Sequence, residues 1–505
     1  MSALPAAPAP APQRRLQSEK RLIRKGVAWN AVAMTVGKGS SILAKIVLAR
    51  FLLPEHFGFY NMTVVFSSII IIVADLGVRQ GLIQRQRDHR TKLLYDSVFW
   101  LMFLASFALI GLVWMIGVPF VVWFYAEPRL APIVVAMCVA IVFQNLQAVP
   151  EARLARSMRF KQIAMADLYG TLAGCVAAVL LAVAGANVWS LVAQTVVAAI
   201  GTCMITFSFS GWRPHMRMNM SILRDLSSYS RFIVGSRVLI SFQQNLDYLL
   251  IGKLIGAYAL GVYSIAFLLT ETLRGKVYWL VSKAVFPFYS RAAGRDEDIR
   301  TVYLGTVRYM SMTIFPTATV LILFAHYIVP ALFTPKWDAA IVPIQILAAA
   351  SMVVASAGTP GEVLRGIGRP EVDFRINLAV LILVAFPALW MGISWAGLPG
   401  AALAVLFHYC VSRLAYACVL WRMIHLPMSD LFRALQRPLL GCGLMAAIAL
   451  LGAPVHALIL LILALAAYAG AVFTLVLPRL KPLFIARFAG PSLAHAETGD
   501  GALSE

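Results

Sequence analysis

Basic side chains occur inside the long apolar stretches of this chain, where a charge is costly unless it faces a cavity or a partner. Lys38 and Lys45 lie seven residues apart in one such stretch. Seven residues is nearly two helical turns, or about 10 Å, so both ammonium groups lie on one side of a helix. Clustered ammonium groups are suited to bind phosphate. We expect Lys38 to face a cavity, whereas Lys45 either shares it or snorkels to the interface.

A second apolar stretch, over 229–254, also carries polar side chains that are poorly suited to lipid. We expect Arg237 to face a cavity. The glutamines either line that cavity or form hydrogen bonds to neighbouring helices. Asp247 is a candidate for coupling transport to an ion. The polar residues of this stretch are Arg237, Gln243, Gln244, Asn245 and Asp247.

Three other charged positions have two interpretations each. Glu271 and Arg274 are spaced i,i+3 and can pair on their own helix, which competes with a role in ligand binding. Asp75 ends an apolar run and either pairs with the basic loop after it or lines an inner gate. Arg413 lies near the middle of a span and is ambiguous. The predicted substrate-binding residues are Lys38, Lys45, Arg237, Gln243, Gln244, Arg274 and Arg413, and the predicted ion-coupling or gating residues are Asp75, Asp247 and Glu271.

The balance of these charges indicates the kind of substrate. Basic side chains within the apolar stretches outnumber acidic ones, which favours an anionic substrate. The chain contains no HExxH, GxSxG or Walker motif, and its histidines have no ligand spacing. The sequence therefore predicts no catalytic residue, no metal site and no cofactor other than H+ or Na+ as a coupling ion.

Composition determines the class of protein that must position these residues. Hydrophobic residues make up 61% of the chain and charged residues 13%, and the mean hydropathy is +0.81. A soluble domain is nearer half apolar and a quarter charged. Apolar runs of about 20 residues, each enough to cross a bilayer, occur throughout. We therefore predict an all-α polytopic membrane protein.

The apolar runs predict about fourteen transmembrane helices. They form two six-helix lobes, over 27–210 and 229–424, followed by two C-terminal helices over 425–478. A disordered basic tail (1–26), a linker (211–228) and a C-terminal tail (479–505) complete the chain, all on the cytoplasmic side. The predicted helices are 27–52, 58–78, 95–118, 131–149, 163–183, 188–209, 229–254, 261–281, 302–328, 339–358, 374–395, 400–424, 438–451 and 457–477.

The distribution of lysine and arginine supports this arrangement. Short cytoplasmic loops are enriched in basic residues. With both termini cytoplasmic, internal segments and the cytoplasmic ends of the adjoining helices hold 32 of the 43 lysines and arginines. The external side holds only Arg50, Arg129, Lys253 and Lys336. This asymmetry accounts for the net charge of +21 without a nucleic-acid partner.

The chain also contains a weak internal repeat. At an offset of 203 residues, a helix, a short turn and a Gly-x-Tyr sequence occur twice. Repeats of this size are typical of the two halves of a transporter. The offset aligns Arg50, Gly58 and Tyr60 with Lys253, Gly261 and Tyr263.

Several segments resemble one protein family. They are ARFLLPEHFGFYNMTVVF and ADLGVRQGLIQRQ near the N-terminus, then NLDYLLIGKLIGAYALGVYSIAFLL, VFPFYSR and GEVLRGIGRPEVDFRINL. In this order they resemble bacterial polysaccharide exporters, the lipid-linked oligosaccharide flippases of the multidrug/oligosaccharidyl-lipid/polysaccharide exporter superfamily, and in particular the colanic-acid and xanthan-type exporters.

The resemblance implies a transporter of the bacterial inner membrane that works by alternating access around a central cavity. Its cargo would be a polyprenyl-pyrophosphate-linked oligosaccharide repeat unit for exopolysaccharide, capsule or O-antigen synthesis. Membrane lipids, a polysaccharide polymerase and export machinery would be its partners. Two alternatives remain open, a cation-coupled drug antiporter of the same superfamily and a membrane-embedded polysaccharide polymerase or transferase. The excess of basic residues argues against the first, and the very short external loops argue against the second.

Overall fold

The structure, a computed structural model, describes residues 29, 33, 35–75, 91–216, 238 and 240–451. All regular elements in these residues are helical. Eight helical stretches in the described part are long and apolar enough to cross a membrane. The predicted all-α, multi-pass membrane fold is confirmed, whereas the number fourteen stays a prediction. Outside the described residues lie Arg237, the predicted helix 457–477, and the tails 1–26 and 479–505.

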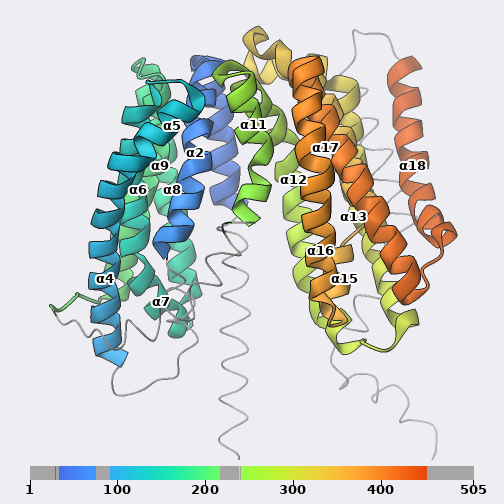
Figure 1. Cartoon of the computed structure of the whole chain (residues 1–505), viewed down its shortest axis with the longest axis horizontal. Helices are drawn as coiled ribbons and strands as arrows, with labels where there is room; N and C mark the ends of the chain where they lie inside the picture. The colour runs from blue at the N-terminus through green and yellow to red at the C-terminus, as the bar shows by residue number, and fades with distance from the viewer. Residues whose placement is uncertain are drawn as a thin grey trace, which may run out of the picture. The chain divides into compact units, whose positions relative to one another are not determined.

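Contacts between α-carbons divide the chain into two compact units, whose helices are shown in Figure 1. The first unit holds the described residues up to Ile265, together with Val329–Ala340 and Ile393–Ala401. The second holds Ala266–Ile328, Ile341–Gly392 and the described residues from Ala402 onward. The two predicted lobes stay a prediction.

The first unit begins with a helix over residues 35–51. A π-helical segment, Val113–Gly117, joins α4 to α5 without a break. The remaining helices of this unit include a tightly packed pair, α8 and α9. Its elements are α2 (Pro54–Asp75), α4 (Thr91–Leu112), α5 (Val118–Tyr125), α6 (Leu130–Leu146), α7 (Ala148–Arg156), α8 (Phe160–Val183), α9 (Val188–Ser210), α11 (Leu246–Leu254) and the 3-10 helix Pro335–Ala340.

Two long helices, α12 (Ala257–Arg291) and α13 (Asp296–Phe333), begin or end in the first unit and continue in the second. The long α17 is bent at Gly397, which has the non-helical angles φ 58° and ψ −131°. A second π-helical segment, Leu381–Ala385, precedes it. The other helices of the second unit are α14 (Ile341–Ser356), α15 (Pro360–Gly366), α16 (Pro370–Val380), α18 (Met428–Leu451) and α17 (Phe386–Ile424) apart from its residues Ile393–Ala401, which belong to the first unit.

Several helices extend beyond the ends predicted from hydropathy. Residues 54–56, which fall between the predicted helices 27–52 and 58–78, are instead the first turn of α2, because proline suits the first helical position, where no N–H partner is needed. The connection expected over 282–300 is mostly helical, since α12 ends at Arg291 and α13 begins at Asp296. Hydropathy detects the apolar middle of a helix and misses its polar ends.

The helix predicted over 229–254 is interrupted, within its described part, at Asn245. The Asn245 side-chain amide donates a hydrogen bond to the carbonyl of Ser241, over 2.7 Å. A side chain that bonds the preceding turn competes with the helical hydrogen bonds. Helix α11 therefore begins only at Leu246, and Gln243 and Gln244 lie before this break.

Glycines allow α8 and α9 to pack backbone against backbone (Figure 1). A Cβ atom added to Gly170 would lie 2.1 Å from the Thr202 hydroxyl oxygen, and one added to Gly174 would lie 2.3 Å from the Gln194 carbonyl oxygen. Because lipid tails are as apolar as the helices, the hydrophobic effect does not drive helix association in a membrane. Close approach through small residues at GxxxG spacing supplies van der Waals attraction instead.

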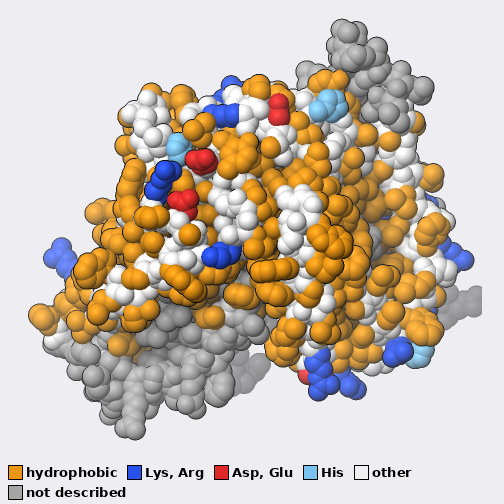
Figure 2. All heavy atoms as spheres, turned by 45° about the horizontal axis from the view of Figure 1, so that its top comes forward, with side chains coloured by type: hydrophobic (Ala, Val, Ile, Leu, Met, Phe, Trp, Pro, Cys, Tyr) orange, Lys and Arg blue, Asp and Glu red, His pale blue; other side chains and the backbone are white. Residues whose placement is uncertain are grey.

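Lipid-facing surface surrounds these buried contacts. Hydrophobic side chains cover most of the face seen in Figure 2, and charged ones are sparse on it. Large apolar side chains such as Trp114, Met115 and Trp123 are more than half exposed. In water such surface would drive aggregation, whereas hydrocarbon solvates it.

We predict that Gly174→Ala lowers the stability of the protein, by about 1–3 kcal/mol, because the added methyl overlaps a backbone carbonyl. Gly305→Ala is the matched control, since a Cβ there meets no atom within 4 Å and alanine suits a helix better than glycine. Thermal unfolding of the purified protein in detergent measures both. Equal midpoints for the two variants would show that the close approach is unimportant.

Candidate functional site

The two predicted lysines of the first span lie on one uninterrupted helix, over residues 35–51. The Lys38 side chain is exposed and Lys45 is half-buried. Adjacent on the same helix, Ser41 accepts a hydrogen bond from the amide of the buried Gln194, at 3.5 Å. The helix therefore carries a polar stripe, and Lys38 is the member whose side chain is exposed among the described residues.

The predicted ion-coupling residue Asp247 is buried at the start of α11. One carboxylate oxygen accepts a 2.8 Å hydrogen bond from the Tyr263 hydroxyl. The other accepts a 2.9 Å bond from the backbone N–H of Tyr248. Two donors on a buried carboxylate compensate for its lost hydration, so Asp247 also has a structural role. Gln243 is half-buried and Gln244 exposed.

In the second unit, Glu271 and Arg274 form the i,i+3 ion pair that their spacing allows. The Arg274 guanidinium also donates to the Tyr409 hydroxyl, at 3.1 Å, and lies 4.9 Å from the centroid of that ring. Arg274 lines a small cavity of about 30 Å³, together with Thr270, Thr317 and Ser351. The arginine at this cavity is thus already paired, so its positive charge is largely offset.

Arg413 lies with its guanidinium 5.9 Å from the ring centroid of Tyr416. Its buried Nε has no hydrogen-bond partner among the described residues. Of the remaining predicted residues, Asp75 is the last residue of α2, and its side chain lies outside the description. The structure does not bring the predicted residues of the first unit together in one described pocket, and their assignment to the substrate stays a prediction.

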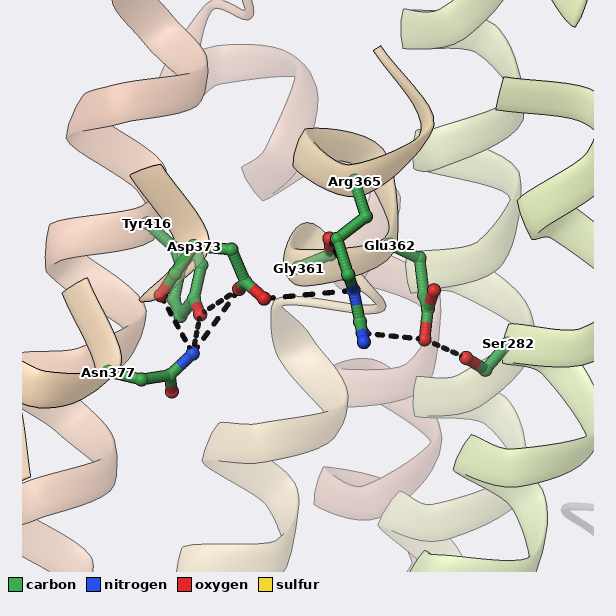
Figure 3. A network of polar contacts seen from close by, with 7 residues as sticks. All are labelled: Ser282, Gly361, Glu362, Arg365, Asp373, Asn377 and Tyr416. Atoms are coloured by element: carbon green, nitrogen blue, oxygen red, sulfur yellow. Dashed lines mark hydrogen bonds and ion pairs between the residues drawn. The ribbon is translucent and has the colours of Figure 1, made fainter. Parts of the chain in front are cut away.

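A polar network that the sequence did not predict joins four helices of the second unit (Figure 3). Arg365 of α15 lies between two carboxylates. Its Nη2 is 2.8 Å from Oε1 of Glu362 and its Nε is 3.6 Å from Oδ2 of Asp373. Ser282 of α12 donates to the same Glu362 oxygen. Arg365 thus bridges α15 and α16, and Glu362 extends the network to α12.

The other end of the network is centred on Asp373. Its Oδ1 accepts hydrogen bonds from the Tyr416 hydroxyl, at 2.5 Å, and from the Asn377 amide, at 3.3 Å. A Cβ on Gly361 would lie 2.7 Å from the same oxygen, so the glycine leaves room for the carboxylate in this position. The network therefore joins α15, α16 and α17 to one another (Figure 3).

The signal for this network was present locally but incomplete. Glu362 and Arg365 have i,i+3 spacing, and Asp373 and Asn377 have i,i+4 spacing, both of which place side chains on one helix face. Their partners Ser282 and Tyr416 come from distant parts of the chain, and no local pattern links them.

We predict that Arg365→Ala lowers the stability of the protein by about 1–3 kcal/mol, because it leaves two largely buried carboxylates without their shared cation. Arg433→Ala is the control, since that arginine also pairs at i,i+3 spacing, with Asp430, but its side chain is 72% exposed, where such pairs contribute little. Thermal unfolding in detergent compares them. A smaller loss for Arg365→Ala than for Arg433→Ala would contradict a structural role for the network.

Curated relatives resemble the chain over most of its length. It is 22% identical to the lipopolysaccharide biosynthesis protein WzxC of Escherichia coli (strain K12), covering 75% of this chain and 77% of that protein. It is 23% identical to the succinoglycan biosynthesis transport protein ExoT of Rhizobium meliloti (strain 1021), covering 84% and 85% respectively.

Solved structures share the fold. The lipid II flippase MurJ, in an inward closed conformation, matches with a TM-score of 0.68 at 12% identity, covering 91% of this chain and 99% of that one. An inward-facing multidrug resistance transporter of the MATE family matches with a TM-score of 0.62 at 16% identity, covering 81% and 99%. The model of one family, described as polysaccharide biosynthesis protein, matches residues 47–342, more than half of the chain. The chain therefore belongs to this family of polysaccharide biosynthesis proteins.

Proposed function

We propose that this protein flips polyprenyl-pyrophosphate-linked oligosaccharide units across the bacterial inner membrane, for exopolysaccharide, capsule or O-antigen synthesis. Membership of the polysaccharide biosynthesis family, over residues 47–342, carries the proposal. Relatives that match most of the chain are named for lipopolysaccharide biosynthesis and for succinoglycan transport. The cargo changes sides and keeps its covalent structure, so the protein is not an enzyme.

The charge of the cargo fits the basic residues of the apolar helices. A pyrophosphate in a region of low dielectric needs nearby cations. The exposed ammonium of Lys38, on a helix rich in apolar residues, is the described group best placed to supply one. The oligosaccharide would travel with the pyrophosphate through a polar path, while the polyprenyl tail remains in the lipid.

The proposed orientation follows from the distribution of lysine and arginine, with both termini and the basic loops in the cytoplasm. The cargo enters from the cytoplasmic side, where it is assembled, and leaves on the other. A polysaccharide polymerase and export machinery are proposed as partners because they would receive the cargo there.

We propose that transport is coupled to H+ or Na+. Three carboxylates are candidates for binding the ion, and they differ in the partners that they already have in the protein. Asp247 is buried with two hydrogen-bond donors, and Glu271 is held by Arg274. Each would have to exchange an existing partner for the ion during the cycle. Asp75 is the third candidate on the basis of its position in the sequence.

We predict that Lys38→Ala reduces polymer export about 10- to 100-fold, because charge-assisted hydrogen bonds contribute roughly 1.5–3 kcal/mol. Lipid-linked repeat units should accumulate inside the cell. Arg237→Ala should behave alike, Lys38→Arg should keep part of the export, and Lys45→Ala should be milder. Extracellular polymer and the lipid-linked pool are measured together.

Lys161→Ala is the matched control for the loss of a lysine. The exposed Lys161 lies 4.8 Å from the ring centroid of Trp29, and we expect normal export from its variant. The abundance of each variant in the membrane is measured alongside. Normal export by both Lys38→Ala and Arg237→Ala, at normal abundance, would refute a role for these cations in binding the cargo.

A further inference from the structure

The two copies of the internal repeat contact each other through their equivalent glycines. A Cβ on Gly58 in α2 would lie 1.8 Å from the carbonyl oxygen of Ala257 in α12. A Cβ on Gly261 in α12 would lie 1.8 Å from the carbonyl oxygen of Pro54 in α2. Because both pairs are related by the same offset of 203, the contact is reciprocal, as in a two-fold symmetric interface. All of these residues belong to the first compact unit.

The aligned basic residues Arg50 and Lys253 occupy equivalent places in this arrangement. Arg50 donates to the carbonyls of Ala331, at 2.6 Å, and Leu332, at 3.0 Å, in the last turn of α13. Lys253 donates to the carbonyl of Phe124, in the last turn of α5. Each cation thus caps the C-terminal end of a helix from the other half of the chain, where carbonyls lack intrahelical partners.

The backbone carbonyls at the end of the first helix also accept hydrogen bonds from side chains that follow α13. The Lys336 ammonium donates to the Arg50 carbonyl, and the indole N–H of Trp337 donates to the Ala49 carbonyl, both at 2.8 Å. Trp337 is fully buried, and its ring meets Phe57 edge-on at 5.2 Å. The end of the first helix and the end of α13 are about 280 residues apart along the chain. Side chains at or just after each end therefore donate hydrogen bonds to backbone carbonyls of the other.

Charge placement supports a dedicated role for this region. Only four basic residues fall on the predicted external side, and three of them, Arg50, Lys253 and Lys336, take part in these contacts. Arg50 and Lys253 are also exposed. Backbone carbonyls at a helix end accept equally well from water, so such contacts can be broken and remade without leaving a buried charge unpaired.

We propose that these contacts form a clasp, made of Arg50, Lys253, Lys336, Trp337 and the glycine crossing, that holds the two repeats together at the external side. When the protein opens to the external side, Arg50 and Lys253 break their hydrogen bonds to the helix ends. They form these bonds again when the protein closes, after the transported molecule has left. This inference rests on the proposed function only for the identity of the transported molecule. It assigns these two cations a gating role and no contact with cargo.

The test uses a cysteine reporter in the clasp. The six native cysteines are first replaced, and Ala49→Cys is then introduced. Ala49 is chosen because it is fully buried and its carbonyl accepts the hydrogen bond from Trp337. Labelling by a membrane-impermeant maleimide, added from outside, is timed in cells. We expect Arg50→Ala and Lys253→Ala each to raise the labelling rate about tenfold, the equilibrium change that corresponds to about 1.4 kcal/mol, and the double variant to raise it further.

Two controls separate opening of the clasp from general loosening. Arg129→Ala removes a basic residue that lies over the Phe59 ring, at 5.9 Å, and whose side chain makes no capping hydrogen bond to α6, so labelling should stay at the parent rate. A second reporter, Ser190→Cys, is fully buried at the start of α9 and is not one of the clasp residues, so it should stay protected throughout. Arg50→Lys keeps the charge and a donor and should restore most of the protection. If an alanine variant is not recovered in the membrane, Arg50→Gln replaces it.

Unchanged labelling of Ala49→Cys in the double variant would overturn the proposal. An equal rise at Ser190→Cys would also overturn it, since the two cations would then stabilise the whole fold. The measurement needs no cargo. If the clasp opens as expected while lipid-linked oligosaccharide is not moved, the gating role stands and the proposed function fails.

Discussion

Backbone polar groups have no water to bond inside a membrane, and this constraint explains much of the structure. A helix satisfies most of its own groups but leaves carbonyls free at its C-terminal end. Here those carbonyls are bonded by side chains from distant segments, by Arg50 and Lys253 on one side and by Lys336 and Trp337 on the other. Other helices, α2 with α12 and α8 with α9, approach closely because glycines stand at their crossings. Helix ends and small residues therefore help to determine which helices are neighbours.

The polar side chains differ in whether they have partners within the protein. Asp247, Glu271 and the network around Arg365 are fully engaged with partners in the protein, so each contributes to the fold whatever else it does. Lys38 differs because its charge is exposed on a helix rich in apolar residues, a costly arrangement in lipid that an anionic head group would relieve. This difference is why the proposed binding role rests on Lys38 and the proposed gating role on Arg50 and Lys253.

The sequence predicted the class of fold and the internal repeat because both depend on patterns that extend over many residues. The pairing of Glu271 with Arg274 was one of two interpretations of their i,i+3 spacing, which is a local property of a helix. The sequence did not predict the break at Asn245, which depends on a single side-chain hydrogen bond. Nor did it predict that Asp373 meets Tyr416, or that Arg50 caps α13, because these partners lie 43 or more residues apart along the chain. The assignment of the other predicted residues to a substrate needs a bound ligand.

The central claim is that the protein moves a lipid-linked oligosaccharide and leaves it chemically unchanged. The most direct measurement reconstitutes the purified full-length protein in liposomes that carry polyprenyl-pyrophosphate-linked oligosaccharide in the inner leaflet. A glycosidase outside the vesicles reports arrival of the sugar, and mass spectrometry of glycosidase-free samples reports its covalent state. We predict protein-dependent exposure of intact lipid-linked sugar, reduced by Lys38→Ala. Sugar that remains inside in the presence of folded protein, or that appears only after a covalent change, would contradict the account.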